Sequence, residues 1–79
     1  MVKEKINQIE RPLDLLNQSK GKKVLVFLKG DKTISGTLIA FDIHINLVLE
    51  NSKNVQDSKS LGLMFIRGDT IEYVSLGDE

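Results

Sequence analysis

The chain has 79 residues, 41% of them hydrophobic, and its eleven Lys and Arg residues balance eleven Asp and Glu residues. A single core in a chain this short rarely supplies more than roughly 3 to 5 kcal/mol, so we expect oligomerisation to contribute to its stability. The zero formal charge excludes a global positive field that would hold phosphate backbones non-specifically. Any nucleic acid must therefore be bound through contacts at a local site.

The first predicted element is a short helix over about residues 12–20. Pro12 suits the first turn of a helix, Asp14 favours its positive end, and Gly21 suits its stop. Its apolar stripe is narrow and consists of Leu13, Leu15 and Leu16. A stripe of this width predicts a lid helix that lies on a surface rather than crossing the core.

From residue 22 onward the hydrophobic period becomes that of strands. Five strands are predicted: Lys23–Lys29, Thr33–Asp42, Asn46–Asn51, Leu61–Arg67 and Thr70–Leu76. Gly30-Asp31 and Gly68-Asp69 predict tight two-residue hairpin links, and residues 51–60 predict a longer polar connection. We expect all neighbouring strands to be antiparallel.

Two features favour a barrel over an open sheet. Gly36 interrupts the long second strand, where a missing Cβ permits a bend or bulge. The first strand is apolar on both faces, so its outer face needs a cover, for which the stripe of Leu13 and Leu16 is a candidate. The sequence therefore predicts a mainly β fold, in which a short helix precedes a five-stranded, strongly bent antiparallel small barrel.

The fourth and fifth strands also carry apolar residues on both faces. Some of this surface has no predicted partner within the chain, and exposed strand edges are natural sites for pairing with another copy. Repeated head-to-tail pairing of these two strands would generate a ring.

The break after the second strand carries alternating polar residues. Asp42, His44 and Asn46 occupy every second position, so an extended backbone would project all three to one side. The residues between and after them, which are Ile43, Ile45 and Leu47, would then face the core.

A second polar group, Arg67-Gly68-Asp69, forms the break before the fifth strand. Together the two groups suit one unstacked base, because the His44 ring and the Arg67 guanidinium can sandwich its faces while the Asn46 amide reads its edge. Stacking is worth roughly 1 to 3 kcal/mol per base, which becomes substantial when several identical sites bind one strand.

These residues carry a resemblance to a known family. Residues 36–49, with Gly36, the Phe41-Asp42 pair and Asn46, resemble the first Sm motif, and residues 63–71 resemble the second. The first motif region covers about 23–51 and the second about 61–76 of a single domain, 1–79. The short length and the lack of basic tails look most like an archaeal Sm-like protein.

The resemblance implies the Sm fold and a homo-oligomeric ring of seven or six subunits, with seven favoured. In this family the fourth and fifth strands pair between neighbours, and uridine-rich single-stranded RNA binds around the central pore. It implies that His44 and Arg67 stack on the base, that Asn46 recognises uracil, and that Asp42 and Asp69 support them. Gly68 matches the turn glycine of the second motif. A role in RNA processing or as an RNA chaperone would follow, without catalysis or cofactor.

Other interpretations of the same residues stay open. Taken alone, His44 is more typical of a surface residue and Asn46 of a turn, and Asp42 and Asp69 are as readily structural as ligand-binding. One imidazole without a thiolate disfavours a transition-metal site. An enzyme is disfavoured because His44 with a nearby carboxylate is the only candidate acid–base pair. The alternative function is a small-barrel scaffold that docks proteins without RNA specificity.

Location is predicted from what the sequence lacks. No apolar run approaches the roughly 20 residues needed to span a membrane, the first residues contain no signal-peptide core, and there is no cysteine. We expect a cytoplasmic protein without a membrane partner.

Overall fold

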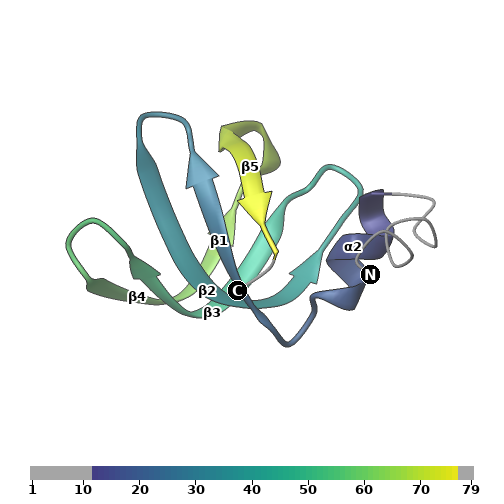
Figure 1. Ribbon diagram of the computed structural model, residues 1–79, viewed down its shortest axis with the longest axis horizontal. Coiled ribbons are helices and arrows are strands. Elements are labelled where there is room, and N and C mark those ends of the chain that lie inside the picture. Colours follow the sequence, from purple (N-terminus) through teal and green to yellow (C-terminus); the bar gives the residue numbers. More distant parts are fainter. Residues whose placement is uncertain (1–11, 77–79) are drawn as a thin grey trace, which may run out of the picture.

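The computed structural model of the chain describes residues 12–76, in which one short helix precedes five strands. In chain order the elements are α2 (Pro12–Gln18), β1 (Lys23–Leu28), β2 (Lys32–Phe41), β3 (Leu47–Asn54), β4 (Lys59–Ile66), the 3-10 turn η1 (Gly68–Thr70) and β5 (Ile71–Ser75). The strands form one antiparallel sheet in the order β4-β3-β2-β1-β5. Figure 1 shows this sheet curled strongly upon itself, which confirms the predicted fold class.

The helix ends at Gln18, two residues before its predicted end, and it does not lie over the outer face of β1. It is followed by a turn in which Gly21 has a φ of 84°, a conformation that glycine adopts without a Cβ penalty. Leu16 is buried in the core, whereas α2 as a whole lies at one end of the curled sheet (Figure 1). The suggested cover for the outer face of β1 is therefore wrong. The ring of Tyr73 on β5 packs there instead against Phe27 of β1, with ring centroids 4.7 Å apart.

The bend of β2 lies where the glycine predicts it. The pairing of β2 with β3 shifts register between Ser35 and Thr37, so Gly36 sits at an irregularity of the ladder. A Cβ at Gly36 would lie 3.1 Å from the Cβ of Leu49, which is tighter than ordinary packing. The bend lets the sheet enclose one apolar core, made of Leu16, Val24, Val26, Ile34, Leu38, Leu47, Leu49 and Ile66.

The connections between strands differ from the prediction in three places. The first link has three residues, since Leu28 pairs with Lys32. β3 and β4 extend through most of the predicted polar connection, so their turn spans only residues 55–58. The halves of β3 and β4 next to this turn are mostly polar and exposed. They therefore lack the alternation of apolar residues by which a strand is predicted from sequence. Ser52 is buried and donates a hydrogen bond from its hydroxyl to the Gly62 carbonyl oxygen, at 2.6 Å.

The third difference concerns the link after β4. β4 and β5 do not form a hairpin, because they occupy opposite edges of the sheet and η1 carries the chain from one to the other. Both edge strands expose large apolar side chains: Leu63 is 71% exposed, Phe65 64% and Tyr73 61%. The predicted edge strands are thus the observed ones. No helix among residues 12–76 is long and apolar enough to cross a membrane.

Candidate functional site

The turn between β2 and β3 is closed by the Asp42 carboxylate. Its Oδ1 accepts hydrogen bonds from the backbone N–H groups of His44 (2.9 Å) and Asn46 (3.1 Å), and its Oδ2 accepts one from Asn46 Nδ2 (3.0 Å). The main chain adds bonds from Ile45 N to Asp42 O and from Asp42 N to Asn46 O. The prediction of extended backbone here is wrong, because a short acidic side chain offers these N–H groups a better partner than solvent.

This turn also changes where its apolar residues lie. Ile43 is 74% exposed rather than facing the core, whereas Leu47 is fully buried and Ile45 packs partly buried against the core. Ile45 has a φ of 63°, which is rare for a β-branched residue and costs on the order of 1 to 3 kcal/mol. The hydrogen bonds of Asp42 and the burial of Ile45 offset this strain.

The same hydrogen bonds favour the ionised form of Asp42. The Asn46 side-chain amide holds the pKa of the Asp42 carboxyl below its ordinary value of 3.8, and the backbone N–H groups of Asn46 and His44 lower the pKa further. Asp42 is therefore ionised at neutral pH, and it serves the turn as an acceptor only.

The second polar segment surrounds η1. Arg67 and Asp69 form an ion pair, with 2.9 Å between Nη2 and Oδ2, and the Thr70 hydroxyl donates to the Arg67 carbonyl oxygen at 2.7 Å. Both charged side chains are exposed, so the pair contributes little stability. Its effect is geometric, because a carboxylate on the edge of the guanidinium leaves the flat cationic face open for stacking.

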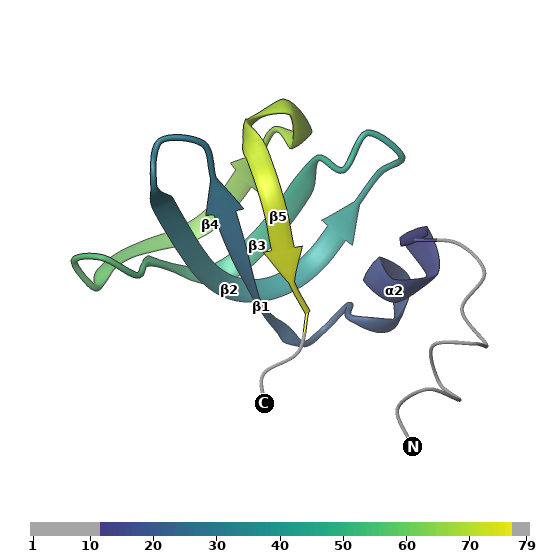
Figure 2. The same cartoon turned by 45° about the horizontal axis from the view of Figure 1, so that its top comes forward.

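Asn46 and Gly68 join the two segments. The Gly68 N–H donates to Asn46 Oδ1 at 2.7 Å, across 22 positions of sequence. A Cβ at Gly68 would collide with the His44 carbonyl oxygen and would lie only 3.0 Å from the Ile45 carbonyl carbon. Glycine is thus required by close approach of two backbones, and Figure 2 shows η1 and the β2–β3 turn on the same side of the barrel.

The two segments enclose an open hollow of about 480 Å³. Five of the six predicted site residues line it, namely His44, Asn46, Arg67, Gly68 and Asp69. Asp42 does not line the hollow, but its carboxylate accepts a hydrogen bond from the Asn46 side chain that does. The structure therefore brings the predicted residues together and gives Asp42 a supporting position.

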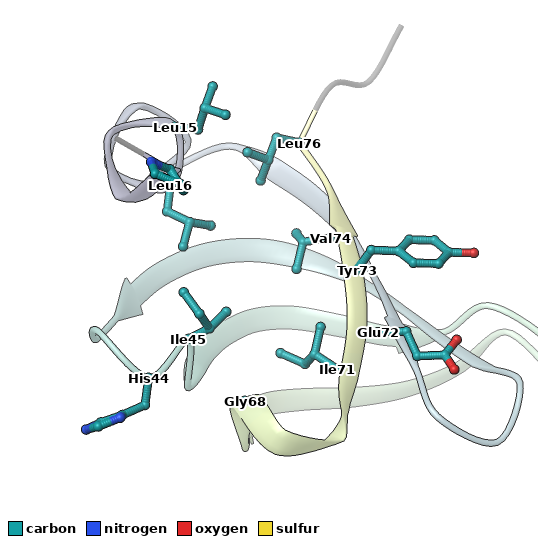
Figure 3. A pocket seen from close by; sticks show the side chains of 11 residues that line it. Leu15, Leu16, His44, Ile45, Gly68, Ile71, Glu72, Tyr73, Val74 and Leu76 are labelled. Atoms are coloured by element: carbon teal, nitrogen blue, oxygen red, sulfur yellow. The ribbon is translucent and has the colours of Figure 1, made fainter. Parts of the chain in front are cut away.

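A second hollow, of about 360 Å³, was not predicted. It lies between α2, β5 and the β2–β3 turn, and its walls include Leu16, Ile45, Ile71 and Val74 (Figure 3). His44 and Gly68 also line it, so the two hollows share a wall. The apolar character of these residues was visible in the sequence, but no local signal indicates that they leave a space.

The polar hollow suits recognition of a flat, unstacked base. It combines an imidazole, a guanidinium face and an amide at an exposed edge of the domain. Among residues 12–76, no three His, Cys, Asp or Glu residues lie close enough to hold a metal ion.

Comparison with known proteins gives consistent relatives. The profile of the LSM domain family matches residues 14–76. An snRNP Sm-like protein of Archaeoglobus fulgidus is 46% identical over 68 residues, which are 82% of this chain and 88% of that protein. The resemblance to the archaeal Sm-like proteins is thereby confirmed.

Solved structures are similar throughout the fold. The Pyrococcus abyssi Sm protein in complex with a uridine heptamer is 42% identical, with a TM-score of 0.80, covering 86% of this chain and all of that one. The SmAP1 heptamer of P. aerophilum is 33% identical, with a TM-score of 0.82, covering 90% of this chain and 99% of that one. These likenesses confirm the Sm fold expected from the sequence.

Proposed function

The chain belongs to the LSM domain family, and from this membership we propose that it is a non-catalytic subunit of a homo-oligomeric ring that binds uridine-rich single-stranded RNA. The observation that carries the proposal is the polar hollow, in which two segments about twenty residues apart present His44, Asn46 and Arg67 together. One base would lie between the imidazole and the guanidinium, with its edge toward the amide.

The orientation of the Asn46 amide supports a preference for uracil. The Asp42 carboxylate only accepts hydrogen bonds and the Gly68 N–H only donates, so these partners dictate which end of the amide faces each of them. One N–H of Nδ2 and one lone pair of Oδ1 remain for a ligand. Uracil offers an oxygen acceptor beside its N3–H donor, whereas cytosine offers the reverse order at the same positions, so a fixed amide distinguishes them.

The ring is supported by the edges of the sheet. β4 and β5 carry Leu63, Phe65 and Tyr73 on exposed surface, and pairing of one copy's β4 with the next copy's β5 would bury them. The similar structure from P. aerophilum is a SmAP1 heptamer, and the one from Pyrococcus abyssi is an Sm protein in complex with a uridine heptamer, so we infer seven subunits here. Seven modest sites on one strand give high avidity without a net positive charge.

The test compares labelled oligouridine, oligocytidine and oligoadenine of seven nucleotides by fluorescence anisotropy. We expect the wild-type protein to prefer oligouridine, and Asn46→Ala to weaken oligouridine binding by about tenfold or more and to abolish the preference. Asn54→Ala is the matched control, because Asn54 is the last residue of β3 and its side-chain oxygen accepts a hydrogen bond from the Gln56 N–H in the β3–β4 turn.

Equal affinity for the three oligonucleotides, or an unchanged preference in Asn46→Ala, would contradict the uracil site. An intact ring that binds none of them would favour the alternative of a protein-docking scaffold. Whether the protein acts in RNA processing or as an RNA chaperone stays a prediction, as does its cytoplasmic location.

A further inference from the structure

Ile45 occupies an unusual position beside the proposed base site. It lies between His44 and Asn46, both of which line the polar hollow, yet its own side chain lies on the opposite side of the turn. Figure 3 shows Ile45 pointing into the apolar hollow toward α2 and β5, while His44 points away from it. One residue thus contacts the core while its two neighbours face the proposed ligand.

The backbone conformation of Ile45 turns its side chain away from the side chains of His44 and Asn46. Its φ of 63° is left-handed, a conformation that a β-branched residue adopts only when its surroundings require it. The backbone N–H groups before and after it, those of His44 and Asn46, both reach the same Asp42 oxygen, Oδ1. The kink at Ile45 therefore belongs to the arrangement that presents His44 and Asn46 together.

The backbone of His44 and Ile45 is also the surface against which the second segment packs. A Cβ placed on Gly68 would collide with the His44 carbonyl oxygen and would lie 3.0 Å from the Ile45 carbonyl carbon, so η1 packs against the backbone of both residues as closely as glycine allows. A shift of Ile45 would move this shared backbone contact, because His44 directly precedes Ile45, and with it Gly68 and the preceding Arg67. The other side of Ile45 faces the apolar hollow, which leaves space for such a shift.

We propose that Ile45 is a positioning residue for uracil recognition, whose side chain anchors the β2–β3 turn under α2 and thereby fixes His44 and Asn46 against Arg67. The inference rests on the proposed function and adds to it a residue that touches no ligand. The packing of Ile45 at the wall of the apolar hollow would then affect RNA affinity and selectivity, because this packing determines how firmly Ile45 is held.

The decisive variant is Ile45→Gly, which adopts the left-handed conformation freely but has no anchor. If the anchor matters, rings of Ile45→Gly should bind oligouridine about tenfold more weakly and with a smaller preference over oligocytidine. Ile45→Leu keeps an apolar side chain of the same size and should restore both values to within about twofold of the wild type.

Ser58→Gly is the matched backbone control, because Ser58 has a φ of 61° in the distant β3–β4 turn. It should leave RNA binding unchanged. The selectivity ratio separates positioning from plain stability, since a substitution that only destabilises the fold lowers the melting temperature but leaves the preference of the remaining rings intact.

The outcomes separate the two claims. A wild-type ring that does not prefer oligouridine would overturn the proposed function itself. A wild-type ring that does, beside an Ile45→Gly ring with the same affinity and preference, would overturn only the role of Ile45. If Ile45→Gly fails to assemble, Ile45→Val, which lacks one methylene of the anchor, gives the same comparison, with an expected loss of about threefold. Wild-type binding by Ile45→Val would then overturn the role.

Discussion

The polar hollow and the edge strands differ in how complete they are within one chain. Asn46, which lines the hollow, is held by Asp42 and by Gly68 through hydrogen bonds of 2.7 to 3.1 Å, so contacts within one chain fix its orientation. On β4 and β5, by contrast, Phe65 and Tyr73 are more than 60% exposed, although the Tyr73 ring contacts Phe27 of its own chain. Under the proposed function, a single chain would therefore specify which base it binds, whereas tight binding of a strand would depend on the contacts that the edges make.

The largest effect is expected when the edge is broken. Phe65→Lys places a charge where we propose that β4 meets the next copy, so the ring should dissociate into folded subunits. Loss of multivalency should reduce apparent affinity for a seven-residue oligouridine by about 100-fold or more. Native mass spectrometry gives the subunit number, and anisotropy gives the affinity.

Val55→Lys is the matched control for this variant, because Val55 is also an exposed apolar residue but lies in the β3–β4 turn and not on an edge strand itself. A Phe65→Lys protein that still forms complete rings would show that β4 is not the subunit contact. Dissociation with unchanged RNA affinity would contradict the division between the two regions.

The next effect is expected at the junction of the two polar segments. Gly68→Ala introduces a Cβ that collides with the His44 carbonyl oxygen, so the segments must separate and the bond from Gly68 N–H to Asn46 must lengthen. We expect a loss of about 2 kcal/mol of stability and roughly 30-fold weaker oligouridine binding, with the ring retained. Chemical denaturation and anisotropy measure the two.

Gly30→Asn is the comparison for Gly68→Ala. Gly30 has a φ of 84° and open space around its missing Cβ, and asparagine tolerates this conformation. It should change neither property by much. If Gly68→Ala also left binding unchanged, the close approach of the two segments would not be needed for the site.

The smallest effect is expected from pH. The pKa of Asp42 is lowered in the folded state, so the stability it contributes is present above its ordinary pKa of 3.8 and is lost as pH falls through the lower folded value. The difference in unfolding free energy between wild type and Asp42→Asn should thus be constant from pH 7 to about pH 5 and shrink below 3.8. Urea denaturation at each pH measures it, and a difference that shrank already near pH 6 would contradict the lowered pKa.

Sequence patterns predicted the parts of this molecule that depend on local chemistry. Pro12 and Gly21 bracket the helix, Gly36 lies at the bend of β2, and the five apolar runs became five strands. The candidate site was predicted as a set, because its two polar groups interrupt the apolar runs. The roles of its residues in RNA binding stay predictions.

The errors have two causes, which are a side-chain hydrogen bond within one segment and a strand pairing between distant segments. Alternation suggested extended backbone through Asp42, His44 and Asn46, but the Asp42 carboxylate folds these residues into a turn. The link at Gly68 was predicted as a hairpin, although β5 pairs with β1 rather than with β4. No periodicity in one segment contains that information.

The sequence by itself determined the class of fold, the family and the residues that meet at the site, because strand propensity, glycine positions and paired polar breaks are local properties of the chain. Only the tertiary structure decided that Asn46 bonds to Gly68, that glycine is needed there because two backbones touch, and that Ile45 lies in left-handed backbone over an apolar hollow. The physical reason is that these features depend on contacts between atoms that are far apart in the chain, and their geometry exists only once the sheet has curled.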